Sequence, residues 1–342
     1  MNKFQLSVDV LGSETEISDI LLGLNQSLER NINYRFKLFG NEILLKKYIS
    51  KFKNLIPNTE IINCEEFVTM SDKPSDAVRN KENSSMSEAI NSVANKDSHA
   101  VLSFGNTGAL MTFSLLKIKT LSEIKRPAIA SIWPNLNGDS IILDLGANTK
   151  LNSQFLIDNA LLGASLASIL FKIDIPSIGL LNVGVEENKG NDEIKTASEK
   201  LRMLSDKSII KYIGFVEGND ISVGKSNVVV TDGFTGNIAL KTAEGTARMI
   251  QKNFKSAFES SIISRLGYFL SSIAMSTVRE RLDPRVRNCG ILMGLNSLVV
   301  KCHGESEYKG VSYAADIIYS LLSNNVNEKI DEYVRKIHLN LN

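Results

Sequence analysis

The sequence predicts an α/β fold, an α/β/α sandwich built on a mostly parallel sheet. The main observation is that short β-like runs alternate with longer helical stretches along all 342 residues. Such alternation is typical of parallel strands joined by right-handed crossovers, with helices on both faces of the sheet. The second observation is that the chain has only six prolines and no repeat or low-complexity tract. We therefore expect a single α/β/α domain that spans residues 1–342.

In the first part of the chain, apolar runs favour strands at 4–10, 34–39, 60–63 and 100–103. Helices are expected at 18–31, from Asn41, at 84–95 and from Ala109. Ile20, Leu24 and Leu28 recur at the spacing of one helix face. Asn41 has a side chain that suits a helix N-cap.

In the remainder, strands are expected at 128–133, 140–145, 177–183, 210–216 and 227–231, with a late strand region at 292–300. Helices are expected at 153–171, at 192–204, over a long stretch after Asn237, and as one or two helices at the end of the chain. The run 160–171 is apolar with interspersed Ser and Gly, which suits a buried helix.

Charge and cysteine content narrow the class of protein. There are 39 basic and 38 acidic residues, a net charge of +1, which argues against a protein built to coat nucleic acid. Cys64, Cys289 and Cys302 are scattered, so neither a disulfide framework nor a C-x-x-C metal site is expected. Residues 1–10 lack the apolar run of a signal peptide, and no stretch of about 18 apolar residues occurs. We expect a cytoplasmic protein with reduced thiols.

Four loops that follow expected strands are rich in Gly, Asn and Asp: 103–109, 144–148, 182–191 and 232–237. Open parallel sheets bind ligands in such loops, at the carboxyl ends of the strands. Glycine allows close backbone approach, and the start of the next helix offers N–H groups to an anion. Each loop alone also suits a plain structural turn. Together, the four predict an anion-binding cleft.

His303 follows an apolar strand and precedes Gly304, which places it at a strand exit. It suits a general acid or a phosphate ligand, and equally a structural histidine. The chain has no P-loop, no G-x-S-x-G elbow, no G-x-G-x-x-G fingerprint and no metal-ligand spacing. We therefore expect neither a metal nor a nucleotide cofactor.

The segment 248–285 is basic, with seven Lys and Arg against three acidic residues. Its apolar residues share one helix face: Ile262, Leu266, Phe269, Leu270 and Ile273. A basic amphipathic helix can lie at a lipid surface. An ordinary helix packed on a core or on a dimer partner has the same pattern.

Ordered motifs through nearly the whole chain then become recognisable. They are 74–86 (PSDAVRNKENSSM), 105–111 (GNTGALM), 126–129 (RPAI), 143–148 (LDLGAN), 179–191 (GLLNVGVEENKGN), 214–221 (GFVEGNDI), 232–245 (DGFTGNIALKTAEG) and 294–304 (GLNSLVVKCHG). With these motifs the chain resembles the bacterial phosphate acyltransferase family, the acyl-acyl carrier protein:phosphate acyltransferases. Departures from the family pattern include Ser13, Glu14 and Ile17 in the opening loop, Cys302, and the bulky Phe104, which we expect to narrow the cleft.

The resemblance implies a fold similar to phosphotransacetylases and isocitrate dehydrogenases, and a homodimer. It implies transfer of a fatty acyl group from acyl-acyl carrier protein to inorganic phosphate. The acyl phosphate product would feed a membrane glycerol-3-phosphate acyltransferase in phospholipid synthesis. Because a thioester is already activated, phosphate can attack directly, without a covalent acyl-enzyme.

Residue roles follow as hypotheses on the matching motifs. The catalytic candidates are Asn106, Thr107, Lys189, Asp232, Asn237 and His303. The candidates for binding phosphate or substrate are Gly105, Gly108, Arg79, Ser84, Ser85, Asn148, Asn188, Gly233, Thr235 and Lys241. The basic segment 245–282 would project at the dimer interface and touch the membrane peripherally through the apolar face named above, or dock the acidic carrier protein. Two alternatives stay open: a phosphotransacetylase-like enzyme that uses acyl-CoA, and a non-catalytic binding protein.

Overall fold

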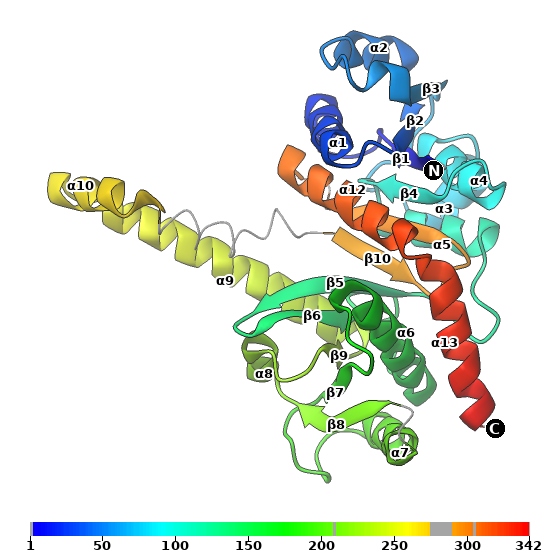
Figure 1. Cartoon of the computed structure of the whole chain (residues 1–342), viewed down its shortest axis with the longest axis vertical. Coiled ribbons are helices and arrows are strands. Elements are labelled where there is room, and N and C mark those ends of the chain that lie inside the picture. The colour runs from blue at the N-terminus through cyan, green and yellow to red at the C-terminus, as the bar shows by residue number, and fades with distance from the viewer. Residues whose placement is uncertain (1–2, 208–209, 274–288, 304–305, 342) are drawn as a thin grey trace.

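The computed structural model describes residues 3–207, 210–273, 289–303 and 306–341, and strands and helices alternate through most of them (Figure 1). The strands are β1 (Phe4–Asp9), β2 (Tyr34–Gly40), β3 (Thr59–Asn63), β4 (Ala100–Ser103), β5 (Ala128–Asn135), β6 (Gly138–Leu143), β7 (Ser177–Leu181), β8 (Lys211–Val216), β9 (Val228–Val230), β10 (Cys289–Met293) and β11 (Leu298–Cys302). The expected strands in residues 4–231 are therefore confirmed, with small shifts at their ends.

The helices carry the same alternation. They are α1 (Ile17–Arg30), α2 (Glu42–Ile49), the short 3-10 helix η1 (Ile56–Asn58), α3 (Pro74–Asn80), α4 (Ser85–Ala94), α5 (Thr107–Lys117), α6 (Ser153–Phe171), α7 (Asp192–Asp206), α8 (Gly218–Val223), α9 (Gly233–Glu259), α10 (Ile262–Leu270), α12 (Tyr308–Ser323) and α13 (Val326–Leu341). Asn41 caps α2 as expected, because its side chain accepts from the backbone N–H of Leu44.

All eleven strands form one sheet in the order β3-β2-β1-β4-β11-β10-β5-β6-β9-β7-β8. Most neighbours are parallel, as expected, but β10 and β11, β10 and β5, and β5 and β6 pair antiparallel. These three reversals mean that β6, β7, β8 and β9 run opposite to β1, β2, β3 and β4. The carboxyl ends of the two sets of strands therefore lie at opposite ends of the sheet.

The late strand region expected at 292–300 is a hairpin rather than one strand. β10 and β11 are antiparallel, with Cys289 opposite Cys302 and Leu292 opposite Val299. Gly294 lies just after β10 with φ +87°, a left-handed conformation that glycine adopts without strain. The chain reverses here, so the apolar pattern of two strands reads as one in the sequence.

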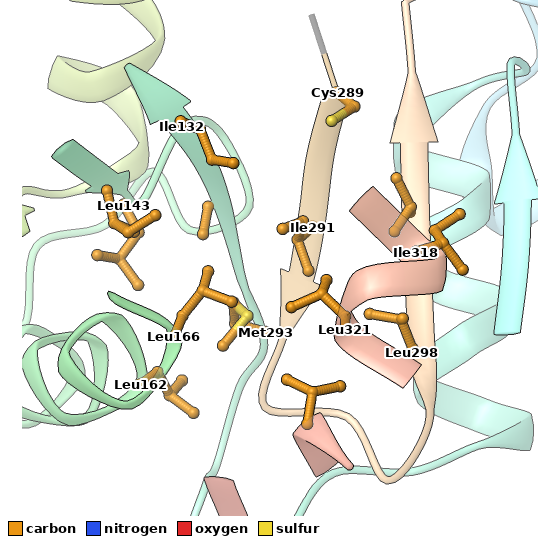
Figure 2. Packing of buried hydrophobic residues seen from close by; sticks show 14 of the residues in the cluster. Ile132, Leu143, Leu162, Leu166, Cys289, Ile291, Met293, Leu298, Ile318 and Leu321 are labelled. Atoms are coloured by element: carbon orange, nitrogen blue, oxygen red, sulfur yellow. The ribbon is translucent and has the colours of Figure 1, made fainter. Parts of the chain in front are cut away.

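Apolar side chains pack on both faces of the sheet. On one face, α1, α6, α12 and α13 cover the larger core cluster, and Figure 2 shows Leu162 and Leu166 of α6 and Ile318 and Leu321 of α12 packed against β10 and β11. Phe104 is fully buried in this cluster, so its side chain does not narrow a cleft as expected. The other face carries α4, α5 and the start of α9. Among the described helices, α6 is long and apolar enough to cross a membrane, but it is mostly buried inside the protein.

Helices α9 and α10 form an arm that projects from the body of the molecule (Figure 1). This arm covers most of the basic segment expected at 245–282; its last residues, from 274 on, lie outside the described part of the chain. The apolar side chains of α10 are exposed.

Candidate active site

A buried hydrogen-bond network links the carboxyl ends of β1 and β4. The Oδ1 atom of Asp9 accepts from the hydroxyl of Ser85 at 2.6 Å, and its Oδ2 atom accepts from Ser103 at 2.7 Å. Burial raises the pKa of Asp9 to about 6, against the opposing effects of these two bonds and the charge of Lys301. Ser85, expected in the substrate site, is therefore a partner of Asp9, while the Ser84 hydroxyl donates to the carbonyl of Lys81.

Asn106 fixes the glycine-rich loop after β4. Its Oδ1 atom caps α5 by accepting from the N–H of Ala109, and its amide nitrogen donates to the carbonyls of Thr69, Met70 and Asp72 at 2.9–3.3 Å. The amide that we expected to be catalytic is thus fully used inside the protein. Its role in this structure is to hold the loop and the first turn of α5 in place.

The first turn of α5 keeps two backbone donors available. The first N–H groups of a helix have no partner within the helix, and here Asn106 satisfies only that of Ala109. Within the described part of the chain, the N–H groups of Thr107 and Gly108 donate to no other protein group. Both residues are half-buried. Two aligned donors at the positive end of a helix suit an anion.

Lys301 and His303 lie at the carboxyl end of β11, next to β4 in the sheet. Lys301 is buried, and its ammonium donates to the carbonyl of Phe104 at 3.1 Å and to the carbonyl of Cys302. Burial, together with a smaller effect of the Lys241 charge, lowers the pKa of Lys301 to about 8, against the opposing effects of Cys302 and Asp9.

Lys241 of α9 joins this group from far along the chain. Its Nζ atom lies 3.5 Å from Nε2 of His303 and 2.9 Å from Oε2 of Glu244. Glu244 is 6% exposed, and within the described residues its Oε1 atom has no hydrogen-bond partner. The pair that we expected in the site, Lys241 and His303, is therefore in contact, and a buried carboxylate holds the lysine.

The loop after β6 is built around Asp144, which is fully buried. Its Oδ1 atom accepts from the N–H groups of Ile129, Gly146 and Ala147, and its Oδ2 atom accepts from the N–H and side-chain amide of Asn148. Burial raises the pKa of Asp144, opposed by these bonds. The Asn148 amide, expected to bind substrate, is used here and on the carbonyl of Pro127.

The polar groups of the loop after β9 cap the start of α9. Asp232 accepts from the N–H groups of Phe234 and Thr235 and from the hydroxyl of Thr235, and the N–H of Gly233 donates to the carbonyl of Asn148. A Cβ on Gly236 would come within 2.0 Å of the Asp144 carbonyl, so glycine is needed for close packing here. In this structure Asp232, Gly233 and Thr235 therefore make capping and packing contacts at the start of α9.

Lys189 and Asn188 are exposed in the loop after β7. The backbone carbonyl of Lys189 accepts from Asn182, and Asp192 and Glu193 lie in the first turn of the following helix. Acidic residues at a helix start oppose anion binding. Since β7 runs opposite to β4, the structure does not bring Lys189 to the first turn of α5. Arg79 is exposed in the last turn of α3.

Helix α9 links the two ends of the site. Asn237 lies against Gly146, where a Cβ would come within 3.8 Å of the asparagine, and Lys241 lies against His303. These two residues are one turn apart on the same helix face, about 6 Å along the axis. The four glycine-rich loops therefore do not lie at one strand edge; α9 connects the 144–148 loop with His303 at the end of β11.

Sequence reasoning did not assign Asp9, Lys301 or Glu244 to the site. Glu244 and Lys301 stand in matched motifs, and Asp9 ends the first apolar strand; a charged residue within an otherwise apolar strand, as in 298–302, was the available signal. Buried charged side chains that face one another, as Asp9 and Lys301 do, are typical of functional sites.

Solved structures share this fold. A EutD phosphotransacetylase from Staphylococcus aureus aligns with a TM-score of 0.58 at 16% identity, covering 93% of this chain and 94% of that one. A phosphotransacetylase from Streptococcus pyogenes aligns with a TM-score of 0.58 at 16% identity, covering 96% and 94%. At these identities the likeness shows the fold alone, which is that of the phosphotransacetylases.

Sequence relatives then show the family. The model of the family described as "Fatty acid synthesis protein" matches residues 4–329. The phosphate acyltransferase of Sinorhizobium medicae (strain WSM419) is 42% identical over 335 residues, 98% of this chain and 96% of its own length. That of Rhizobium meliloti (strain 1021) is 42% identical over the same share of each chain. The chain belongs to the bacterial phosphate acyltransferase family, and it is an acyltransferase of fatty acid and phospholipid synthesis.

Proposed function

We propose that the enzyme transfers a fatty acyl group from acyl-acyl carrier protein to inorganic phosphate. A phosphate oxygen attacks the thioester carbonyl and forms the C–O bond of the acyl phosphate. The C–S bond breaks, and the carrier-protein thiol leaves and takes up a proton. No covalent acyl-enzyme is required, because the thioester is already activated.

The observation that carries the proposal is the open first turn of α5. The N–H groups of Thr107 and Gly108 are available to an oxyanion, whereas the donors of α9 are used in capping. Lys241 and His303 add positive charge and a ring nitrogen at the adjoining strand end. Preorganised donors of this kind stabilise charge that develops in a tetrahedral transition state.

The first experiment measures phosphate-dependent loss of acyl-acyl carrier protein, with acyl phosphate trapped by hydroxylamine. We expect turnover with the carrier-protein donor and at least about 10-fold lower kcat/KM with acyl-CoA, a difference of about 1.4 kcal/mol. Equal or better turnover with acyl-CoA would favour a phosphotransacetylase-like donor. No turnover with either donor, in a folded protein, would leave the binding-protein alternative.

We further propose a homodimer that touches the membrane peripherally through the α9–α10 arm. The α9 helix exposes the apolar side chains of Phe234, Met249 and Phe254. At its tip, Ile262 is 85% exposed and Phe269 is 73% exposed. An acyl phosphate is lipid-like, so release at a membrane would deliver it to a membrane glycerol-3-phosphate acyltransferase.

A double variant tests the membrane contact. Leu266→Glu with Phe269→Glu places two negative charges on the exposed apolar face of α10 and removes the exposed Phe269 ring. Because apolar burial and attraction to anionic lipid are both lost, we expect co-sedimentation with phosphatidylglycerol vesicles to weaken by more than about 10-fold.

The matched control is Ile32→Glu with Ile43→Glu, which adds the same charges at exposed apolar positions near α1 and α2. We expect this control to sediment like the wild type. Equal sedimentation of all three proteins would remove the membrane role. If only the KM for the carrier-protein donor rises in the α10 variant, the arm docks the carrier protein instead.

A further inference from the structure

Three neighbouring strands place an acid, a hydroxyl and a base in one row. Ser103 of β4 is in register with Asp9 of β1 on one side and with Lys301 of β11 on the other. Residues in register on parallel strands project from the same face of the sheet. Asp9 and Ser103 are fully buried, and Lys301 is 9% exposed.

The side chains of Lys301 and Ser103 bind the two ends of one peptide group, that between Phe104 and Gly105. The carbonyl of Phe104 accepts from the Lys301 ammonium at 3.1 Å. The N–H of the same peptide, that of Gly105, donates to the Ser103 hydroxyl at 3.2 Å, and this hydroxyl donates to Asp9 at 2.7 Å. The Phe104–Gly105 peptide therefore cannot rotate without breaking a charge-assisted bond. Two residues later, Thr107 begins α5.

Stability alone does not account for two charged groups in this position. A buried acid and base are seldom more stabilising than apolar residues of similar size, because both lose their hydration. Burial raises the pKa of Asp9 and lowers that of Lys301, which are the directions expected when each charge is costly. The groups around Lys301 are Asp9 on β1, Lys241 on α9 and Cys302 on its own strand.

We propose that Lys301 is a positioning residue for phosphate, acting through the Phe104–Gly105 peptide. Asp9 holds the other end of this peptide through the Ser103 hydroxyl. The ammonium does not contact phosphate. It fixes the turn that aims the N–H groups of Thr107 and Gly108, because it holds the Phe104 carbonyl just before α5 begins. The proposal rests on the proposed function, in which phosphate binds at the start of α5.

The test is the pair of variants Lys301→Met and Asp9→Asn, with steady-state kinetics and thermal unfolding of each. We expect Lys301→Met to raise the KM for phosphate by at least about 10-fold, the loss typical of one charge-assisted bond. The KM for the acyl donor is expected to change by less than about 2-fold. Asp9→Asn keeps an acceptor for Ser85 but weakens the hold on Ser103, so we expect a rise of about 3-fold in the same KM.

Lys37→Met is the matched control, because Lys37 is a largely buried lysine on β2 whose charge faces Glu60. We expect its kinetics to equal those of the wild type. A parallel change in both KM values with a lower melting temperature would mean that Lys301 is only structural, and would overturn the proposal. So would an unchanged phosphate KM in both variants. If Lys301→Met does not fold, Asp9→Asn alone decides. If the wild type shows no phosphate-dependent turnover, the proposed function fails instead.

Discussion

Replacing Asp144 by alanine is expected to lower the free energy of unfolding by about 4 kcal/mol or more. The carboxylate is fully buried and accepts five hydrogen bonds, four of them from backbone N–H groups. Each buried donor left without a partner costs about 1–3 kcal/mol, although the losses are not additive. Urea unfolding at pH 7 measures the effect.

Two further variants separate this role from a general loss of charge. Asp144→Asn keeps an acceptor at the Oδ1 position but turns an NH₂ group toward the N–H of Asn148, so we expect an intermediate loss of about 2 kcal/mol. Asp232→Ala removes the N-cap of α9 and is expected to cost about 1 kcal/mol. An Asp144→Ala variant no less stable than Asp232→Ala would show that the 144–148 loop does not depend on this carboxylate.

The local elements were predictable from the sequence because their signals are local. The run 100–103 is buried at every position and ends at a turn, and β4 has these bounds. The apolar run 153–171 forms α6 with the bounds expected from the sequence. The hairpin of β10 and β11 was missed: Gly294, Asn296 and Ser297 separate its two apolar runs, but the reversal of the chain at the left-handed Gly294 is visible only in the structure.

The site was predictable only in part, because strand order is not local. Asp9 lies 94 residues from Ser103, and Lys301 lies 197 residues from Phe104, yet all meet at one strand end. The glycine-rich loops at 144–148 and 232–237 have the composition of anion-binding loops. Their donors are instead used on Asp144 and Asp232. Composition shows that donors are present, whereas only the structure shows which of them are still available.

Helix α9 shows how local sequence signals and long-range contacts act together. Its glycines at 233 and 236 allow close packing on the 144–148 loop, and this packing sets the direction in which the helix crosses the sheet. That direction brings Lys241 to His303, 62 residues away in the chain. The contact that favours phosphate binding therefore depends on loops that have structural roles.

Removing the ammonium of Lys241 is the change from which we expect the largest loss of activity. Lys241→Met should lower kcat/KM for phosphate by about 100-fold, the effect typical of losing one preorganised donor to developing negative charge. The side chain is held by Glu244 at 2.9 Å and lies 3.5 Å from His303, so its charge is aimed at the strand end beside α5. Lys241→Arg keeps the charge and is expected to retain more activity than Lys241→Met.

Lys252→Met is the control, because Lys252 is an exposed lysine on the same helix, about 16 Å further along its axis. We expect its phosphate kinetics to match those of the wild type. The buried Glu244 keeps Arg248 at 3.7 Å when Lys241 is removed, so the variant should fold, with a measurable drop in melting temperature. If Lys241→Met folds and its kcat/KM for phosphate stays within about 3-fold of the wild type, Lys241 has no part in the reaction. Phosphate would then depend on the α5 donors alone.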